Sequence, residues 1–273
     1  MTGLHVLVTN DDGVDAPGLD ALVRALRGLP AVDFTVIAPT TNQTGASGSI
    51  TTTEFDVLPA ETMSGHAATA VTGSPSDAVL FGLRQHLAER PALVVAGVNE
   101  GPNLADFVTM SGTVAAALAA ARLGIPALAV SAGLAPEMDY GRPARFAASL
   151  VARFRDDVRL RSDMLLSGSR ETAIVLNVNF PPIPPRGVRV VPLGRIADVT
   201  GYVRRAESSA RVTWEPVIVA GDITRVHSGS TLAAPVTDLE AFNHGFVAIT
   251  PLVPDLTLAE APGRFGFIEE LTP

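Results

Sequence analysis

The sequence predicts an α/β protein with a Rossmann-like three-layer sandwich, in which helices cover both faces of a mostly parallel sheet and an antiparallel β extension projects from it. Short, almost wholly apolar segments typical of buried strands alternate with segments of helical periodicity. Several of these apolar segments end in a polar, glycine-bearing turn, as strands do at the ligand-binding edge of open α/β sheets. At 273 residues the chain is long enough for one sizeable domain, which we expect to span residues 1–273.

The first three expected elements form one β-α-β unit. The strand Leu4–Thr9 is nearly all apolar and stops at the turn Asn10–Gly13. Four apolar residues between positions 19 and 26 then recur at helical spacing, and residues 33–39 form a second short strand. A strand, a helix and a strand in this order give a parallel pair with a right-handed crossover. Side chains that follow the two strands are therefore expected at the same edge of the sheet.

The rest of the chain continues this alternation. Further strands are expected at 68–71, 93–96, 124–131, 172–182 and 246–252, with a weaker strand-like segment at 50–57. Further helices are expected at 79–87, 113–121, 146–154 and 237–244. The strand at 93–96 is apolar on both faces, which indicates a central position in the sheet.

The pattern changes between residues 183 and 235. Four short segments alternate with period two and have no helix between them: 188–191, 202–204, 211–214 and 217–219. This pattern favours antiparallel strands or a projecting hairpin, and exposed strand edges favour self-association. We expect 183–235 to be a β-hairpin extension that contributes to oligomerisation, with a plain edge extension of the sheet as the alternative.

Composition excludes several classes of protein. The chain has no cysteine, so it forms no disulfide, zinc–thiolate site or cysteine nucleophile, and this fits a reducing cytoplasmic location. It also has no lysine, which removes the Walker-type phosphate lysine and the Schiff-base lysine. The net charge of −8 gives no electrostatic footprint for duplex nucleic acid or an anionic membrane. With no signal-peptide pattern and no bilayer-spanning apolar segment, we expect a soluble cytoplasmic protein.

The turn after the first strand is a candidate metal site. Asp11 and Asp12 are adjacent carboxylates beside the amide of Asn10. Like charges crowded in this way repel each other, and a hard cation is the usual device that offsets the repulsion. The same residues also fit an ordinary solvated turn, because Asn, Asp and Gly are the commonest turn formers.

Two further polar loops are expected at the same edge of the sheet. Residues 40–49 follow the second strand and are rich in hydroxyls and glycines, and residues 97–103 follow the strand at 93–96. The loop 40–49 taken alone also fits a flexible surface loop. Three polar loops after three apolar strands indicate a common site, because the carboxyl ends of parallel strands meet at one edge.

A candidate anion site lies at the start of the alanine-rich helix. Ser111, Gly112 and Thr113 precede this helix, where free backbone N–H groups and the two hydroxyls could bind phosphate. Ordinary N-capping is the alternative, since Ser and Thr are also favoured there.

Taken in order, these motifs resemble the stationary-phase survival protein SurE family, from the first strand to about Leu252. The segments that carry the resemblance are Asn10–Gly13, 38–39 with 42–45, 73–75 with Asp77, 97–103, 111–113, 177–179 with Pro181, 237–238 and 250–252. Each segment is weak alone, but the combination in this order is highly specific. The resemblance implies a metal-dependent nucleotidase that assembles as a homodimer or homotetramer, and it favours the metal-site interpretation of Asp11 and Asp12.

The resemblance also implies roles for individual residues. The metal ligands would be Asp11, Asp12, Thr44 and Asn99, and the phosphate-binding residues would be Asn103, Ser111, Gly112 and Thr113. At position 44 the family usually has serine, so the hydroxyl is retained and a methyl group is added. Ala96, Met110 and Ala119 also depart from the family pattern. These departures bear on substrate range and pocket shape more than on the reaction.

The ligand types then define the expected chemistry. Two carboxylates, a hydroxyl and an amide suit one hard divalent ion per subunit, Mg²⁺ or Mn²⁺, which would activate water and polarise a phosphoryl oxygen. Asp11 or Asp12 would orient or deprotonate that water, and the sequence does not assign which.

The expected activity is therefore that of a 5'-nucleotidase that converts nucleoside 5'-monophosphates, and also 3'-monophosphates, to nucleoside and inorganic phosphate. The alternatives are a catalytically silent nucleotide-binding protein and a broader phosphatase or exopolyphosphatase. A serine-nucleophile hydrolase is disfavoured, because the chain lacks a Gly-x-Ser-x-Gly elbow.

Overall fold

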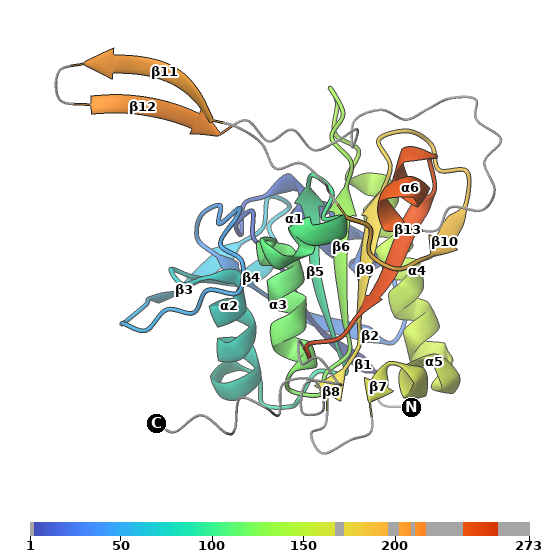
Figure 1. Ribbon diagram of the computed structural model, residues 1–273. Helices are drawn as coiled ribbons and strands as arrows, with labels where there is room; N and C mark the ends of the chain where they lie inside the picture. Colours follow the sequence, from blue (N-terminus) through green and yellow to red (C-terminus); the bar gives the residue numbers. More distant parts are fainter. Residues whose placement is uncertain (1–2, 167–171, 196–201, 209–210, 217–236, 256–273) are drawn as a thin grey trace, which may run out of the picture.

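The computed structural model describes residues 3–166, 172–195, 202–208, 211–216 and 237–255, with the backbone alone in 202–208 and 211–216 (Figure 1). The strands of the main sheet are β1 (Leu4–Thr9), β2 (Val32–Pro39), β3 (Val57–Glu61), β4 (Ala67–Val71), β5 (Leu93–Glu100), β6 (Ala127–Ala132), β9 (Val175–Phe180), β10 (Val188–Val190) and β13 (Val247–Leu252). The α-helices are α1 (Pro17–Arg27), α2 (Pro75–Phe81), α3 (Gly112–Ala121), α4 (Gly141–Asp156), α5 (Val158–Asp163) and α6 (Asp238–Asn243). Two small pairs are β7 (Leu165–Leu166) with β8 (Thr172–Ala173) and β11 (Tyr202–Ser208) with β12 (Arg211–Pro216).

The nine strands form one sheet in the order β10-β13-β9-β6-β5-β1-β2-β4-β3. The central run from β9 to β4 is parallel throughout, while β13 and β3 are antiparallel to their inner neighbours. The central strand β1 pairs with both β2 and β5, so the three polar loops that follow these strands lie at one edge. This arrangement confirms the expected mostly parallel sheet.

Helices cover both faces of this sheet, as the burial of β1 on both faces requires. Val6 and Val8 belong to the core cluster that includes residues of α1 and α4, whereas Leu7 belongs to the cluster that includes α2 and α3. Successive side chains of a strand point to opposite faces, so a strand buried on both faces must be apolar at every position. The run Leu4–Val8 satisfies this requirement apart from His5, whose ring bonds to the Thr35 hydroxyl. The three-layer sandwich is therefore confirmed.

Small residues bring two helices close to the functional edge of the sheet. A Cβ atom at Gly18 would lie 1.9 Å from the carbonyl oxygen of Val98, so the start of α1 contacts the end of β5 directly. The alanine-rich helix α3 is buried along almost its whole length, because it packs against the sheet on one side and against its neighbour α2 on another. Alanine suits this position because it favours the helix and lets neighbouring backbones approach.

Several elements differ from the sequence-based expectations. Residues 188–190 form β10, which lies parallel to β13 at the sheet edge and covers it, instead of belonging to an antiparallel hairpin. Residues 50–56 form no strand, and β3 begins at Val57. The helix after Ser74 ends at Phe81 and continues as a π-turn over Gly82–His86. The helix expected at 146–154 is longer, because its amphipathic pattern begins at Gly141.

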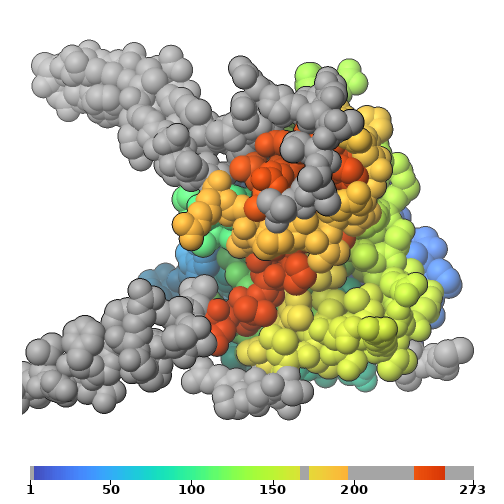
Figure 2. Space-filling view, turned by 45° about the vertical axis from the view of Figure 1, so that its right-hand side comes forward, coloured from blue at the N-terminus to red at the C-terminus, as the bar shows by residue number. Residues whose placement is uncertain are grey.

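The strands β11 and β12 form a separate antiparallel pair that projects from the sandwich (Figure 1). This pair confirms the expected projecting β extension, whereas the segment 217–219 lies outside the described residues. In the space-filling view, β13 in red lies on the surface next to the gold segment that carries its neighbour β10 (Figure 2). Within the described part of the chain, no helix has both the length and the apolar character needed to cross a membrane.

Candidate functional site

The turn after β1 is fixed by the side chain of Asn10. Its Nδ2 donates to the carbonyl oxygen of Gly13 at 2.8 Å, and its Oδ1 accepts from the Gly13 N–H at 3.3 Å. Gly13 has a φ of 109°, which a residue without Cβ adopts at little cost. Because Asn10 is fully buried and uses its amide within the turn, it holds the turn in shape and leaves Asp11 and Asp12 to face the site.

Asp11 lies directly beneath the start of α3. The hydroxyl of Thr113 donates a hydrogen bond to Asp11 Oδ1. A Cβ atom at Gly112 would lie 2.7 Å from Asp11 Oδ2 and 2.8 Å from Asp11 Cβ, so only glycine leaves room for this carboxylate. Burial raises the pKa of Asp11 above its ordinary value, although the Thr113 hydrogen bond acts in the opposite direction.

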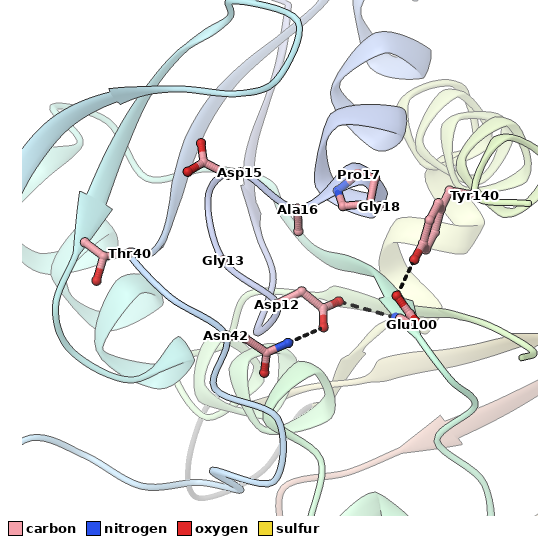
Figure 3. Close-up of a pocket in the computed structure, with 10 residues that line it drawn as sticks. All are labelled: Asp12, Gly13, Asp15, Ala16, Pro17, Gly18, Thr40, Asn42, Glu100 and Tyr140. Atoms are coloured by element: carbon pink, nitrogen blue, oxygen red, sulfur yellow. Dashed lines mark hydrogen bonds between the residues drawn. The ribbon is translucent and has the colours of Figure 1, made fainter. Parts of the chain in front are cut away.

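Asp12 lies beside Asp11 and is half-buried. Its Oδ1 accepts from Asn42 Nδ2 at 3.2 Å, and its Oδ2 accepts from the Glu100 N–H at 3.3 Å (Figure 3). Burial, followed by the negative charge of Asp11, raises the pKa of Asp12 to about 6. Two neighbouring carboxylates with raised pKa values form a site that a divalent cation would stabilise, because its charge favours the ionised form of both.

Asn99 reaches the same edge through a bulge in β5, a feature that the sequence analysis missed when it ended this strand at Ala96. The pairing of β5 with β6 shifts between Ala96 and Asn99, so that one extra residue is inserted on the β5 side. Gly97, with a φ of 137°, occupies the bulge. Asn99 Nδ2 donates to the carbonyl of Gly101 at 2.7 Å, which leaves the amide oxygen as the atom suited to a cation.

The loop that carries Thr44 is held against the two carboxylates by its neighbours. The Gln43 N–H donates to the carbonyl oxygen of Asp11 at 2.6 Å, and Asn42 contacts Asp12 as described above. The Asn42 Oδ1 atom in turn accepts from the Thr44 N–H at 2.8 Å. Thr44 is exposed, so its hydroxyl is accessible from solvent at this edge. The alternative of a loop without fixed contacts is therefore wrong for residues 42–44.

Two of the predicted phosphate-binding residues, Ser111 and Thr113, already use their hydroxyls in hydrogen bonds within the protein. Ser111 is the N-cap of α3, because its Oγ accepts from the Val114 N–H at 3.1 Å, and the Thr113 hydroxyl donates its hydrogen bond to Asp11. The capping interpretation thus holds for Ser111, and the backbone N–H groups at the start of α3 remain as anion donors.

Asn103 is bonded into the sheet. Its Nδ2 donates to Ser131 Oγ at 3.0 Å, and its carbonyl accepts from Asn177 at 2.8 Å and from Asn179 at 3.0 Å. Asn103 therefore anchors the loop after β5 to β6 and β9. Its side chain keeps one N–H that no contact described here uses.

The donor set fits a hard metal ion. Among the described residues no group of three or more His, Cys, Asp and Glu could hold a metal. A metal ion bound by the two carboxylates would need neutral oxygens to complete its coordination, and the Asn99 amide and the Thr44 hydroxyl are at the same edge. An all-oxygen set of this kind suits Mg²⁺ or Mn²⁺ and disfavours zinc.

A cavity of about 240 Å³ opens beside Asp12 (Figure 3). It is lined by Asp12, Gly13, Asp15, Ala16, Pro17, Gly18, Thr40, Asn42, Glu100 and Tyr140. The Tyr140 hydroxyl donates to Glu100 Oε2 at 2.6 Å, and burial together with this carboxylate raises the pKa of Tyr140. Glu100 stands in the polar loop 97–103 without a predicted role of its own, and Tyr140 stands in no predicted motif, because a contact between side chains 40 positions apart leaves no periodic signal in a single sequence.

Fold and site together place the chain in the class of α/β proteins that bind a ligand at the carboxyl edge of an open, doubly wound sheet. A family model described as Survival protein SurE matches residues 6–200. The chain belongs to the SurE family, as the sequence motifs indicated.

Individual relatives agree over nearly the full length. The 5'/3'-nucleotidase SurE of Edwardsiella ictaluri is 35% identical over 96% of this chain and 95% of that protein. The 5'-nucleotidase SurE of Methylococcus capsulatus is 37% identical over 96% of both proteins. A crystal structure of the SurE protein from Aquifex aeolicus superposes with a TM-score of 0.75 at 28% identity and covers 97% of this chain and 100% of that one.

Proposed function

We propose that this protein is a metal-dependent 5'-nucleotidase, a phosphoric monoester hydrolase that converts nucleoside 5'- and 3'-monophosphates to nucleoside and inorganic phosphate. The observation that carries the proposal is the adjacent pair of the buried Asp11 and the half-buried Asp12 at the sheet edge, with Asp11 directly against the start of α3. The relatives named 5'-nucleotidase and 5'/3'-nucleotidase, which match over nearly the whole chain, support the same activity.

The proposed metal ligands are Asp11, Asp12, Thr44 and Asn99, which would hold one Mg²⁺ or Mn²⁺ per subunit. When bound there, such an ion supplies a Lewis acid for the phosphoryl group and lowers the pKa of water. The protein keeps its two carboxylates in place with Thr113 on one side and Asn42 on the other. This preorganisation lets the ligands act without rearrangement during the reaction.

The other residues of the site bind and orient the substrate. The N–H groups at the start of α3 and the Ser111 hydroxyl donate to phosphoryl oxygens and stabilise the charge that develops on them. Water attacks phosphorus, and the bond from phosphorus to the nucleoside oxygen breaks. Asp12 is the better placed of the two carboxylates to orient this water and accept its proton. It is the more accessible one, since Asp12 is half-buried and Asp11 is buried.

The proposed activity is tested by measuring phosphate release from adenosine 5'- and 3'-monophosphates by protein freed of metal with a chelator. We expect no turnover until Mg²⁺ or Mn²⁺ is added back, and full recovery with one of the two ions. A protein that binds adenosine monophosphate but releases no phosphate with either ion would be a silent nucleotide-binding protein. Activity that survives complete chelation would exclude the metal-dependent mechanism.

The projecting pair β11 and β12 is our proposed oligomerisation device, in a homodimer or homotetramer. Among the described residues its two strands pair only with each other, and the outer edge of such a hairpin can pair with a strand of another subunit. Light scattering is expected to give at least twice the chain mass of 28.3 kDa. Replacement of residues 202–216 by a short Gly-Ser linker should shift the protein toward monomer, and a monomeric parent at micromolar concentration would contradict the proposal.

We also propose a cytoplasmic location, because a chain without cysteine has no need of an oxidising compartment. Fractionation of cells that express the native gene checks this directly, and recovery of the protein outside the cytoplasmic fraction would contradict it.

A further inference from the structure

The cavity beside Asp12 has a charge that is unsuited to phosphate. Three of its lining residues are the carboxylates Asp12, Asp15 and Glu100, and none of its lining residues is basic. Away from the ion that Asp12 would bind, a phosphate dianion placed in this cavity would be repelled by Asp15 and Glu100, whereas the start of α3 beside Asp11 offers N–H donors. In a bound nucleotide the phosphate therefore lies toward α3, and the uncharged part of the substrate lies in the cavity.

The cavity is large enough to hold the sugar of a nucleotide but not the sugar together with its base. At about 240 Å³ the cavity is smaller than the roughly 300–1,000 Å³ of sites that enclose a drug-sized ligand. It is large enough for a five-membered sugar, while a base attached to that sugar would extend beyond it. The sugar is also the part of a nucleotide next to its phosphate, which lies within reach of Asp12.

Glu100 is held so that it can bind such a sugar. Its backbone N–H bonds to Asp12, and its Oε2 accepts from the Tyr140 hydroxyl at 2.6 Å, so both ends of the residue are fixed (Figure 3). The second carboxylate oxygen remains as an acceptor at the cavity wall. A carboxylate in this setting suits the two neighbouring hydroxyls of ribose, and dinucleotide-binding folds use an acidic side chain for the same purpose.

We propose that Glu100, positioned by Tyr140, binds the ribose hydroxyls of the substrate and makes the enzyme prefer ribonucleotides to 2'-deoxyribonucleotides. This inference rests on the proposed nucleotidase activity. Asp15 lines the same cavity, but its carboxylate is turned away from Asp12 and Glu100 (Figure 3). Glu100 is thus the wall carboxylate that can face a sugar whose phosphate is held beside Asp12.

The test is the ratio of kcat/KM for adenosine 5'-monophosphate to that for its 2'-deoxy analogue. We expect a ratio of about ten in the parent, because one hydrogen bond to a charged group is lost with the deoxy substrate and Glu100 is partly exposed to solvent. Glu100→Ala should lower the ratio to about one, and Glu100→Gln to an intermediate value. Tyr140→Phe should also lower it, since the ring remains and only the hydroxyl that orients Glu100 is removed.

Two controls distinguish a loss of ribose binding from misfolding and from a general effect of the charge in the cavity. Phenyl phosphate has no ribose, so its hydrolysis reports whether a variant is folded and chemically competent, and the Glu100 variants should retain it. Asp15→Asn should keep the parent ratio, because it changes a carboxylate of the same cavity that does not face the sugar. A parent ratio near one, or a ratio unchanged in Glu100→Ala while phenyl phosphate is hydrolysed, would overturn the inference. Absence of nucleotide hydrolysis in the parent would instead overturn the proposed function.

Discussion

Asp11→Asn and Asp12→Asn are each expected to lower kcat/KM for nucleoside monophosphates by a factor on the order of 10³. Each substitution keeps the shape of the side chain and removes one of the two charges that would hold the metal ion. The loss should appear as weaker metal affinity in a calorimetric titration and as low turnover at saturating metal. Parent activity in both variants would exclude the carboxylate pair as the metal site.

The stability of the metal-free variants distinguishes this effect from misfolding. The pKa of Asp12 is raised from 3.8 to about 6, so folding favours its neutral form. The contribution of neutral Asp12 to the free energy of unfolding is therefore present below pH 4 and is lost as the pH rises through about 6. At pH 7 the metal-free Asp12→Asn variant should therefore be as stable as the parent or more stable, by about 1–2 kcal/mol after solvent screening is considered. Thermal unfolding between pH 4 and pH 7 measures this difference.

Thr44 allows a matched test of a neutral metal ligand. Thr44→Val keeps the shape and deletes the oxygen, and we expect metal affinity to fall about tenfold or more. Thr44→Ser keeps the oxygen and removes only the methyl group, so it should bind metal at least as well as the parent. Equal metal titrations for Thr44→Val and the parent would show that the hydroxyl is not a ligand.

Gly112→Ala is expected to lower kcat/KM about 10²-fold, although alanine is the better helix former. The added Cβ would lie 2.7 Å from Asp11 Oδ2 and 2.8 Å from Asp11 Cβ, so the carboxylate must move. Asp11 is held by Thr113 and by the sheet, and a shift of about 1 Å in a site of this kind can cost 10²-fold in rate. Gly112→Val should lose more, because its branched side chain needs more of the same space.

Gly28→Ala is the matched control for this prediction. Gly28 ends α1 with a φ of −80°, and a Cβ there would meet only a carbonyl oxygen at 3.7 Å. The kcat/KM of Gly28→Ala should stay within about twofold of the parent value. The circular dichroism spectra of Gly28→Ala and Gly112→Ala should be similar. If Gly112→Ala behaved like Gly28→Ala, Asp11 would not need the close approach of α3.

The elements that could be predicted from the sequence are those whose burial is periodic. The run Leu4–Val8 is apolar because β1 is buried on both faces, and the polar turns after β1, β2 and β5 follow from the parallel arrangement. The position of β10 could not be predicted, because its alternating pattern fits an edge strand of either direction. Only its pairing with β13 decides between them.

For the candidate site, too, the positions of the loops could be predicted from the sequence, whereas the contacts of individual side chains could not. The motif residues of the three polar loops after β1, β2 and β5 meet those at the start of α3 at one edge of the sheet, as expected from the order of the strands. The partner of each side chain could not be predicted, and Thr113 was expected to face phosphate but donates to Asp11. Glu100 lies in the motif 97–103 but has no predicted role there, and Tyr140 belongs to no motif. The contact between them exists only because α4 begins beside the end of β5.

The parallel connections around β1 also determine when the site can form during folding. Asp11 and Thr113 are 102 residues apart in the chain, and β2, α2 and β5 lie between them. Contacts of such high sequence separation form only after several crossover loops have closed, which makes parallel sheets slow to fold. An ion or nucleotide therefore finds no assembled target in the early collapsed chain. Such ligands should slow unfolding much more than they accelerate folding.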